Sequence, residues 1–398
     1  MIDVELLRKN PQDFQESLKN RFIKTDYIEQ FLGVDKKWRE IITLTDQLRA
    51  QKKDLSTDFN TAQTNQEKIK NISAQISTKE KELANLEKQR KEFLSRIPNL
   101  LSKDVPIGEG ETANTVIKKI GEDRQVEGIS HDQLMTKLGW LNTEAAANTT
   151  GARFRYLLSE AASTHLKLVS KAQQFAINKG FVPVITPVMA KSNLLEAGGF
   201  FPDGEEDTFK VDEDLYLSGT SEYLLVGLYA GKTLKAEDLP IRLVGFSTCF
   251  RKEAGSYGKD TKGMFRVHQF DKVEMVSICK KEDSEKEHQF LLSMQEEFVS
   301  SLNLPFQVVL IGSGDTEKKA IKRYDIETWF PGQNKHRETH SVSNCTDYQS
   351  RSLGIKVKKV DATEFAHTLN GTLYTERTLL ALIENNQTPD GKVNLPND

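Results

Sequence analysis

Residues 250–275 read FRKEAGSYGKDTKGMFRVHQFDKVEM, and this stretch decides how the second half of the chain folds. Two strand-like pieces flank a loop rich in Gly, Ser, Lys and Asp. Arg251 stands at the end of the first piece and Arg266 at the start of the second. Two guanidiniums on one face of such a hairpin could hold a polyphosphate, because their planar forks pair with anionic oxygens. A hairpin of surface charges is the competing interpretation.

Similar strand-like runs lie on both sides of this segment and indicate an α+β body. They start at residues 181, 241, 265, 306 and 324, and read FVPVITPV, IRLVGFSTCF, FRVHQFDKVEMVSI, FQVVLIG and YDIETWF. Helical periodicity predicts helices at 154–178, 283–303 and 376–387. Because no β–α–β–α rhythm occurs, we expect antiparallel strands with flanking helices. The chain has neither GxxxxGK[ST] nor GxGxxG after a strand, so a nucleotide would need another phosphate grip.

The region before residue 100 has a different texture and predicts a long helical hairpin. Between residues 34 and 97 there is no proline, and apolar side chains recur at steps of three and four. Such spacing is typical of a coiled coil, here with one run from Val34 to Phe59 and another from Ile69 to Ile97. Asn60–Asn65 is the predicted reversal. Each helix would extend roughly 40 Å.

The charge of this hairpin leaves two interpretations open. Residues 34–97 hold 14 Lys and Arg against 10 Asp and Glu. A solvated coiled-coil surface explains this mild excess, and so does contact with a nucleic-acid backbone. The whole chain carries a formal net charge of −3, so any nucleic acid would be held by local patches.

Length and composition limit the number of domains and the classes of site that the chain can form. The chain has 398 residues, enough for a domain 1–105 with the hairpin and a larger domain 106–398. Its 3 cysteines form no CxxC pair, which argues against a structural zinc site or a disulfide framework. The N-terminus lacks the apolar run of a signal peptide, and no stretch is long and apolar enough to cross a membrane. We therefore expect a cytoplasmic protein.

Taken together, these segments resemble the seryl-tRNA synthetases, one family of class II aminoacyl-tRNA synthetases, in their bacterial type. Residues 250–275 resemble the family's motif 2 nearly residue for residue. The N-terminal MIDVELLRKNP, the hairpin, and four further segments follow in the family's order: GARFRYLL at 151, TSE at 220, YDIETWFPGQNKHRE at 324 and NGT at 370. The resemblance implies a class II antiparallel sheet with flanking helices, plus an N-terminal antiparallel coiled-coil arm.

The resemblance also implies an ATP site. It assigns nucleotide contacts to nine positions: Arg251, Lys252, Glu253, Arg266, Val267, Phe270, Glu338, Ser341 and Arg377. In the family the residue at Arg251 contacts the α-phosphate and the substrate carboxylate, and the residue at Glu253 reads the adenine amino group. Phe270 and Arg377 match the side chains that cover the base from its two faces. Arg266 matches the residue that reaches the distal phosphates.

The remaining implied contacts are for Mg²⁺ and for serine. Glu338 and Ser341 match the family's magnesium-binding positions, and Glu338, Arg251 and Arg377 match its catalytic set. The positions for serine are Thr220, Ser221, Glu222, Arg251, Glu274, Asn370 and Thr372. Glu222 would hold the ammonium, and Glu274 the region of the ammonium and hydroxyl. A site built to hydrogen-bond a hydroxyl rejects substrates that lack one.

The implied activity is ATP-dependent formation of seryl-adenylate, followed by transfer of serine to tRNA-Ser and also to tRNA-Sec. The implied partners are L-serine, ATP and tRNA. A homodimer is implied because Pro187 matches the motif 1 proline of the dimer element. The loop Gly255–Gly263 matches the part that meets the acceptor end of tRNA, and the arm matches the element that grips the tRNA by shape.

Two departures from the family pattern bear on the pocket. From Thr372 to Arg377 there are five steps where six are usual, with Tyr374 and Glu376 in place of small residues. His340 and Val342 also stand where small hydroxyl or thiol residues are common. The sequence leaves two alternatives open. One is a synthetase-like paralogue with another carrier or without catalysis, and the other is a structural coiled-coil adaptor, which leaves the body unexplained.

Overall fold

The computed structural model describes residues 1–57, 65–124, 128–253 and 264–395. It divides into two compact units, Ile2–Pro98 and Asn99–Asp398, the latter together with Met1. The sequence predicted the first domain to end at residue 105. In the structure the division falls directly after Pro98, the residue that follows the last arm helix and its cap.

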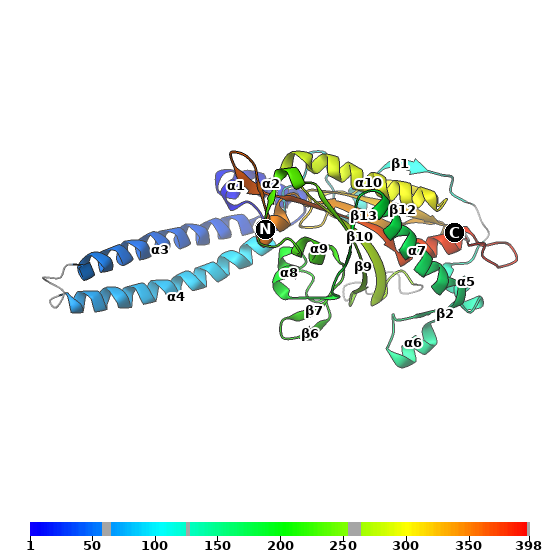
Figure 1. Cartoon of the computed structure of the whole chain (residues 1–398), viewed down its shortest axis with the longest axis horizontal. Helices are drawn as coiled ribbons and strands as arrows, with labels where there is room; N and C mark the ends of the chain where they lie inside the picture. The colour runs from blue at the N-terminus through cyan, green and yellow to red at the C-terminus, as the bar shows by residue number, and fades with distance from the viewer. Residues whose placement is uncertain (58–64, 125–127, 254–263, 396–398) are drawn as a thin grey trace. The chain divides into compact units, whose positions relative to one another are not determined.

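The N-terminal unit consists of two short and two long helices (Figure 1). They are α1 (Val4–Lys9), α2 (Pro11–Asn20), α3 (Asp26–Thr57) and α4 (Gln66–Arg96). Asp3 caps α1 by accepting from two backbone amides, and Pro11 opens α2, where its missing N–H costs nothing. The helices α3 and α4 lie side by side and antiparallel, which confirms the predicted arm. The predicted reversal at 60–65 lies outside the described residues, except for Asn65.

A buried carboxylate joins the helices at the base of the arm. Asp35 on α3 is fully buried and accepts from Arg8 (Nε to Oδ2, 2.9 Å), Arg39 (Nε to Oδ2, 3.1 Å) and Arg90 (Nε to Oδ1, 2.9 Å). The Arg90 guanidinium also lies over the Trp38 ring, 3.9 Å from its centroid. These contacts link α1, α3 and α4, so they fix the start of the arm in a way that the apolar seam alone would not.

The larger unit is built on one eight-stranded sheet in the order β1-β11-β12-β13-β16-β10-β9-β4. The bounds in chain order are β1 (Thr115–Ile120), β4 (Val182–Ile185), β9 (Ile241–Phe250), β10 (Gln269–Cys279), β11 (Phe306–Leu310), β12 (Lys322–Phe330), β13 (Lys335–Asn344) and β16 (His367–Thr375). All neighbours are antiparallel except β9 and β4, which are parallel. This confirms the predicted α+β sheet.

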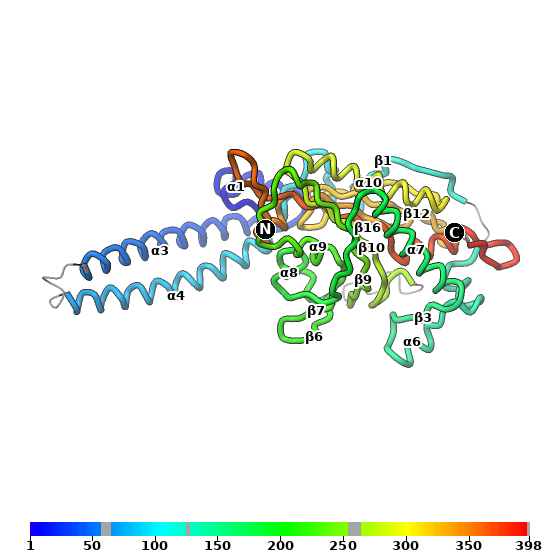
Figure 2. The backbone as a smooth tube through the Cα atoms, viewed as in Figure 1, coloured from blue at the N-terminus to red at the C-terminus, as the bar shows by residue number. Residues whose placement is uncertain are grey.

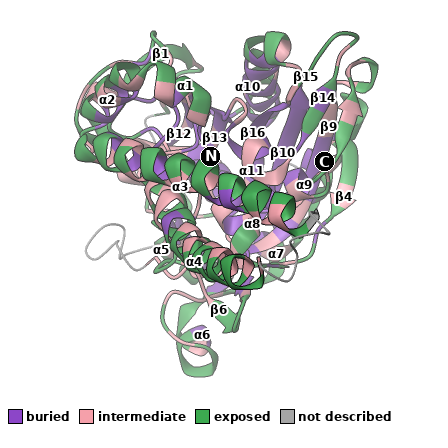
Figure 3. Cartoon of the chain, turned by 90° about the vertical axis from the view of Figure 1, so that its left-hand side faces the viewer, coloured by how far each residue is buried: buried purple, intermediate pink, exposed green. Residues whose placement is uncertain are grey.

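Helices cover the sheet and enclose the main core. The long ones are α7 (Ser159–Asn178), α10 (Ser284–Ser301) and α12 (Glu376–Asn385); the short ones are α5 (His131–Lys137), α6 (Thr143–Thr149), α8 (Ser192–Ala197), α9 (Glu222–Gly227) and α11 (Tyr348–Leu353). The adjacent strands β16 and β10 lie inside the sheet and are buried almost throughout, as Figure 3 shows. Within the described part of the chain, no helix has the length and apolar character needed to cross a membrane.

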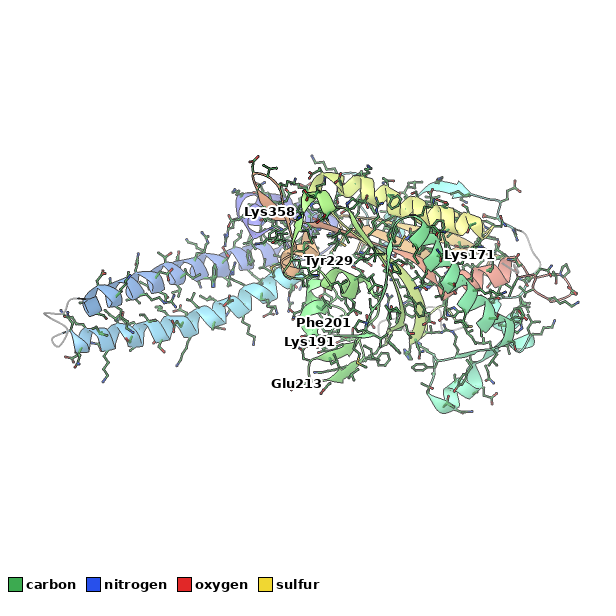
Figure 4. All side chains as sticks on the ribbon, in the orientation of Figure 1. Lys171, Lys191, Phe201, Glu213, Tyr229 and Lys358 are labelled. Atoms are coloured by element: carbon green, nitrogen blue, oxygen red, sulfur yellow. The ribbon has the colours of Figure 1, made fainter. Side chains whose placement is uncertain are left out.

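Three small sheets complete the unit, and the tube in Figure 2 traces how the chain runs between them. They comprise β2 (Leu141–Asn142) with β3 (Tyr156–Leu157); β5 (Met189–Ala190), β7 (Leu215–Leu217) and β6 (Lys210–Asp212); and β15 (Thr363–Phe365), β14 (Lys356–Lys358) and β8 (Thr233–Lys235). Phe201, labelled in Figure 4, packs edge-on against Tyr216 of β7 at 5.0 Å between ring centroids.

Two predicted boundaries were wrong, each for a local reason. The helix expected from residue 154 begins at Ser159, because Tyr156 and Leu157 pair with Asn142 and Leu141 as β3. The strand expected from residue 265 begins at Gln269. The preceding Phe265 turns into the core instead, where its ring packs against Phe330 at 4.9 Å between centroids.

Candidate active site

One pocket of about 360 Å³ lies over the sheet of the larger unit. Its walls come from the residues that follow β9, from β10, β12, β13 and β16, and from the starts of α9 and α12. The predicted site residues that line it are Thr220, Glu222, Arg251, Glu253, Arg266, Val267, Phe270, Glu338, Ser341, Asn370, Thr372 and Arg377. Predicted residues as far as 157 positions apart in sequence, Thr220 and Arg377, therefore line the same cavity.

Three predicted site residues do not line the pocket. Glu274 is buried behind Thr372 and accepts a hydrogen bond from its hydroxyl (3.2 Å from Oγ1 to Oε2). Ser221 is fully buried at the start of α9, and its hydroxyl faces the Gly245 carbonyl at 3.5 Å. Lys252 places its ammonium 5.8 Å from the centroid of the Phe209 ring.

Arg251 follows the last residue of β9 and is held in place from behind. Its Nε and Nη2 donate to the Gly219 carbonyl at 3.3 and 3.2 Å. The guanidinium carbon lies 5.3 Å from the centroid of the Phe270 ring on the neighbouring strand β10. A planar cation and an aromatic face are thus presented together at one wall of the pocket.

Glu253 and Arg266 lie against each other beside Arg251. Arg266 Nη1 donates to Glu253 Oε2 at 2.7 Å. Glu253 adopts a left-handed backbone conformation (φ 52°), which is uncommon for a residue with a Cβ. The carbonyl of Glu253 accepts from Arg153 Nη1 at 3.1 Å, which supports this turn. The carboxylate of Glu253, which is predicted to read adenine, is therefore paired with the guanidinium of Arg266, which is predicted to bind phosphate.

A guanidinium lies on each side of Glu338. Arg323 Nη2 donates to its Oε1 at 2.9 Å, and Arg377 Nη1 donates to its Oε2 at 3.0 Å. Burial raises the pKa of Glu338, but the charges of Arg323 and Arg377 outweigh it, so the pKa of this carboxyl lies below its ordinary value. Glu338 is consequently ionised at neutral pH. The shortened segment between Thr372 and Arg377 still brings both residues to the pocket wall.

Glu338 and Ser341 fit an oxygen-ligated cation in chemical type. Both line the pocket from β13, and carboxylate and hydroxyl oxygens are the ligands that Mg²⁺ takes in proteins. The ionised state of Glu338 favours a cation further. Because Arg323 and Arg377 already donate to both of its oxygens, a metal would share this carboxylate with them.

The lining also includes hydroxyls, an amide and paired charges, among them Thr220, Asn370, Thr372 and Glu222. Lys272 Nζ lies 2.6 Å from Glu274 Oε2 and donates to Thr220 Oγ1 at 3.1 Å. Burial raises the pKa of Glu274 above its ordinary value, although Lys272 acts in the opposite direction. Glu222 accepts from Lys319 Nζ at 2.6 Å on both oxygens and from Gln349 Nε2 at 2.7 Å.

Several polar residues of this site were missed by sequence reasoning. They are Lys272, Glu317, Lys319, Arg323 and Gln349. Lys272 carried a usable signal, since it lies two residues before Glu274 on one strand and so points to the same face. Lys319 carried none, because the residue that it contacts lies 97 positions away.

Comparison with known proteins agrees with this geometry. The family model for the seryl-tRNA synthetase N-terminal domain matches residues 1–101. The model for the class II tRNA synthetase core domain (G, H, P, S and T) matches residues 207–386. The first match covers the helical arm, and the second covers all of the predicted site residues.

Full-length relatives are similar over the whole chain. The serine–tRNA ligases of Nitrosopumilus maritimus and Thermococcus onnurineus are each 38% identical over 100% of this chain, covering 97% and 94% of their own lengths. The crystal structure of seryl-tRNA synthetase from Pyrococcus horikoshii complexed with ATP matches with a TM-score of 0.92 and 36% identity, over 100% of this chain and 96% of that one. These matches do not test the bacterial type, which stays a prediction. The chain belongs to the seryl-tRNA synthetase family.

Proposed function

We propose that the chain ligates serine to tRNA-Ser in this pocket, first activating L-serine with ATP and then charging the tRNA. The observation that carries the proposal is the convergence of Arg251, Glu338 and Arg377 with the hydroxyl-lined end at Thr220 and Thr372 in one cavity. A cavity that combines anion-binding guanidiniums with small hydroxyl and carboxylate side chains suits the two substrates of amino-acid activation.

ATP would bind along the guanidinium-rich side. The adenine would stack on Phe270 beneath Arg377, with Glu253 reading its amino group and with the backbone around Lys252 and Val267 lining the base. This mode requires the Arg266–Glu253 pair to separate, since one partner turns to the distal phosphates and the other to the base. The solved Pyrococcus horikoshii relative is complexed with ATP, which supports this assignment.

Glu338 and Ser341 would hold Mg²⁺. When bound, it would supply charge neutralisation to the leaving pyrophosphate. Arg323 on the far side of Glu338 keeps the carboxylate ionised and oriented.

Serine would occupy the recess formed by Thr220, Glu222, Asn370 and Thr372, with Glu274 behind the Thr372 hydroxyl. Arg251 would hold its carboxylate next to the α-phosphate. A carboxylate oxygen then attacks the α-phosphorus, the bond to the β-phosphate oxygen breaks, and pyrophosphate leaves. In the second step the terminal hydroxyl of the tRNA attacks the seryl carbonyl carbon. The bond from that carbon to the phosphate oxygen breaks, and AMP leaves while its phosphate takes up the hydroxyl proton. Catalysis rests on positioning and charge stabilisation.

The further assignments follow the same resemblance. We assign residues 1–105 to tRNA binding and 106–398 to catalysis, and we propose a cytoplasmic homodimer that also charges tRNA-Sec. The acceptor-end loop Gly255–Gly263 lies outside the described residues. The exposed apolar side chains of the edge strand β4, Val182 and Ile185, support pairing with a second copy at the motif 1 element.

Serine-dependent ATP–pyrophosphate exchange tests the proposal. We expect exchange with L-serine and far weaker exchange with alanine and threonine, followed by aminoacylation of tRNA-Ser. A chain that exchanges with none of the three, although folded by circular dichroism, would contradict the proposed activity. Exchange without charging of tRNA-Ser would contradict the proposed carrier.

A further inference from the structure

The carboxylate assigned to the substrate ammonium is already occupied by an ammonium of the chain itself. Lys319 Nζ lies 2.6 Å from both Oε1 and Oε2 of Glu222, and Gln349 Nε2 donates to Oε1 at 2.7 Å. The side chains of Lys319 and Glu222 are only 4% and 3% exposed. Little solvent therefore screens this ion pair. Both carboxylate oxygens of Glu222 already accept hydrogen bonds.

Lys319 keeps its charge in this position. Burial lowers the pKa of its ammonium, but the charges of Glu222 and Glu317 more than compensate, so the pKa is raised above its ordinary value. Glu317 Oε2 lies 3.5 Å from Lys319 Nζ. The ring of Phe200 lies against the ammonium on another side, 4.4 Å away at its centroid. A permanently protonated lysine thus stands directly behind the proposed ammonium subsite.

Glu274, the second carboxylate of this recess, is also paired with a lysine. Lys272 Nζ lies 2.6 Å from Glu274 Oε2. Each of the two carboxylates assigned to serine therefore has its own lysine. A substrate ammonium that approaches Glu222 meets an already neutralised carboxylate and the like charge of Lys319, so it gains less than it would from an unpaired carboxylate.

We propose that Lys319 is a specificity-determining residue of the amino-acid recess: by pairing with Glu222 it weakens recognition of the α-ammonium, so that acids with the β-hydroxyl but no α-ammonium are rejected less strongly. This inference rests on the proposed function, because it takes serine as the substrate of the same pocket. It concerns the choice between substrates and leaves the chemistry of activation unchanged.

The test compares L-serine with 3-hydroxypropionate, which has the same carboxylate and β-hydroxyl but hydrogen in place of the ammonium. The measured quantity is the ratio of the two kcat/KM values in ATP–pyrophosphate exchange. For Lys319→Met we expect this ratio to rise on the order of tenfold, mainly through a lower KM for serine with kcat nearly constant. In Lys319→Met/Glu222→Gln the ratio should return to near the wild-type value, because the unbalanced carboxylate is gone.

Lys318→Met is the matched control. This neighbouring lysine pairs with the exposed Asp203 (2.6 Å) and does not line the pocket, so its loss should leave the ratio unchanged. Lys319→Gln keeps a hydrogen-bond donor without the charge, and serves if the methionine variant fails to fold. A ratio that is unchanged or lower in a folded Lys319 variant, or a serine KM that rises, would overturn the inference, since Lys319 would then only hold Glu222 in place.

A binding measurement separates this inference from the proposed function. Calorimetry would compare two non-hydrolysable seryl-adenylate analogues, one with the α-ammonium and one without. If the wild type shows no serine-dependent exchange but Lys319→Met favours the ammonium-bearing analogue at least about tenfold more than the wild type does, the proposed activity fails and the inference stands. If serine supports exchange but neither ratio responds to Lys319, the inference fails and the activity stands.

Discussion

At the scale of single residues, Arg251 is the side chain on which activation should depend most. It lines the pocket, is held by the Gly219 carbonyl and lies beside Phe270. We expect Arg251→Ala to lower serine-dependent exchange by at least about 10²-fold, because charge stabilisation at the α-phosphate is lost. The surface variant Lys179→Ala should exchange normally. Near-normal exchange in a folded Arg251→Ala protein would refute the assigned role.

Thr372 should decide between serine and alanine. Its hydroxyl donates to the buried Glu274, so the two groups form a ready site for the substrate hydroxyl. We expect Thr372→Val to lower kcat/KM for serine roughly 10–100-fold and to change that for alanine little, because only serine loses a hydrogen bond. Thr233→Val, at an exposed position on β8, is the control. Equal losses with both amino acids would mean that Thr372 acts only on the fold.

The sequence predicted most of the pocket residues because each lies in a short segment whose order resembles a family. Arg251, Phe270 and Glu338 are identified by such local spacing, and the structure brings them to one cavity. The pairing of Lys319 with Glu222 could not be predicted in this way. It depends on where the turn before β12 passes the start of α9, which only the packed fold determines.

At the scale of elements, the Asp35 cluster should control the stability of the arm. Removing a buried carboxylate leaves Arg8, Arg39 and Arg90 without their shared acceptor, so Asp35→Ala should weaken the N-terminal unit by about 3 kcal/mol. Amide hydrogen exchange in α1 and α3 would measure this, with the exposed Arg49→Ala as control. Unchanged protection in Asp35→Ala would contradict the prediction.

The same cluster predicts a pH dependence of arm stability. Burial raises the pKa of Asp35, but the hydrogen bond from Arg8 and the charges of Arg90 and Arg8 bring it below its ordinary value. A lowered pKa in the folded state means that the stabilisation is complete above the unfolded pKa of about 3.9 and is lost as the pH falls through the folded value. The difference in protection between the native chain and Asp35→Ala should therefore be constant from neutral pH down to about pH 5 and shrink below about pH 4.

The arm itself should matter for the second reaction step alone. A variant that joins Ile41 to Leu86 through a short glycine linker keeps Asp35 and Arg90 but removes the outer arm. We expect its serine-dependent exchange to stay within about twofold of the full chain, while kcat/KM for charging tRNA-Ser falls on the order of 100-fold, since shape and backbone contacts to the tRNA are lost. Equal charging by both proteins would contradict the role of the arm.

Strands were predicted only where they are apolar. The run IRLVGFSTCF at 241–250 is β9 residue for residue, because alternating apolar side chains face two packed layers. The strands β13 and β16, which pair with each other, read KHRETHSVSN and HTLNGTLYT and were not predicted as strands. Polar side chains of these strands, such as Glu338 and Thr372, line the pocket. Because these positions serve the site, the two strands lack the alternating apolar pattern by which a strand is predicted.

At the scale of the whole molecule, the open edge of the large sheet predicts an interface with a second copy of the chain. The sheet ends at β4, where Ile185 is 92% exposed and Val182 is 56% exposed. An apolar edge strand of this kind is a hazard for a monomer and an interface for a dimer. If a second copy covers β4, Ile185→Asp should shift the chain toward the monomer in size-exclusion chromatography with light scattering at micromolar concentration. Val360 provides the control, because it is 99% exposed in the β14–β15 hairpin. Since that hairpin lies in a different sheet, Val360→Asp should remain dimeric. A monomeric native chain, or equal dimerisation of both variants, would place the interface elsewhere or exclude it.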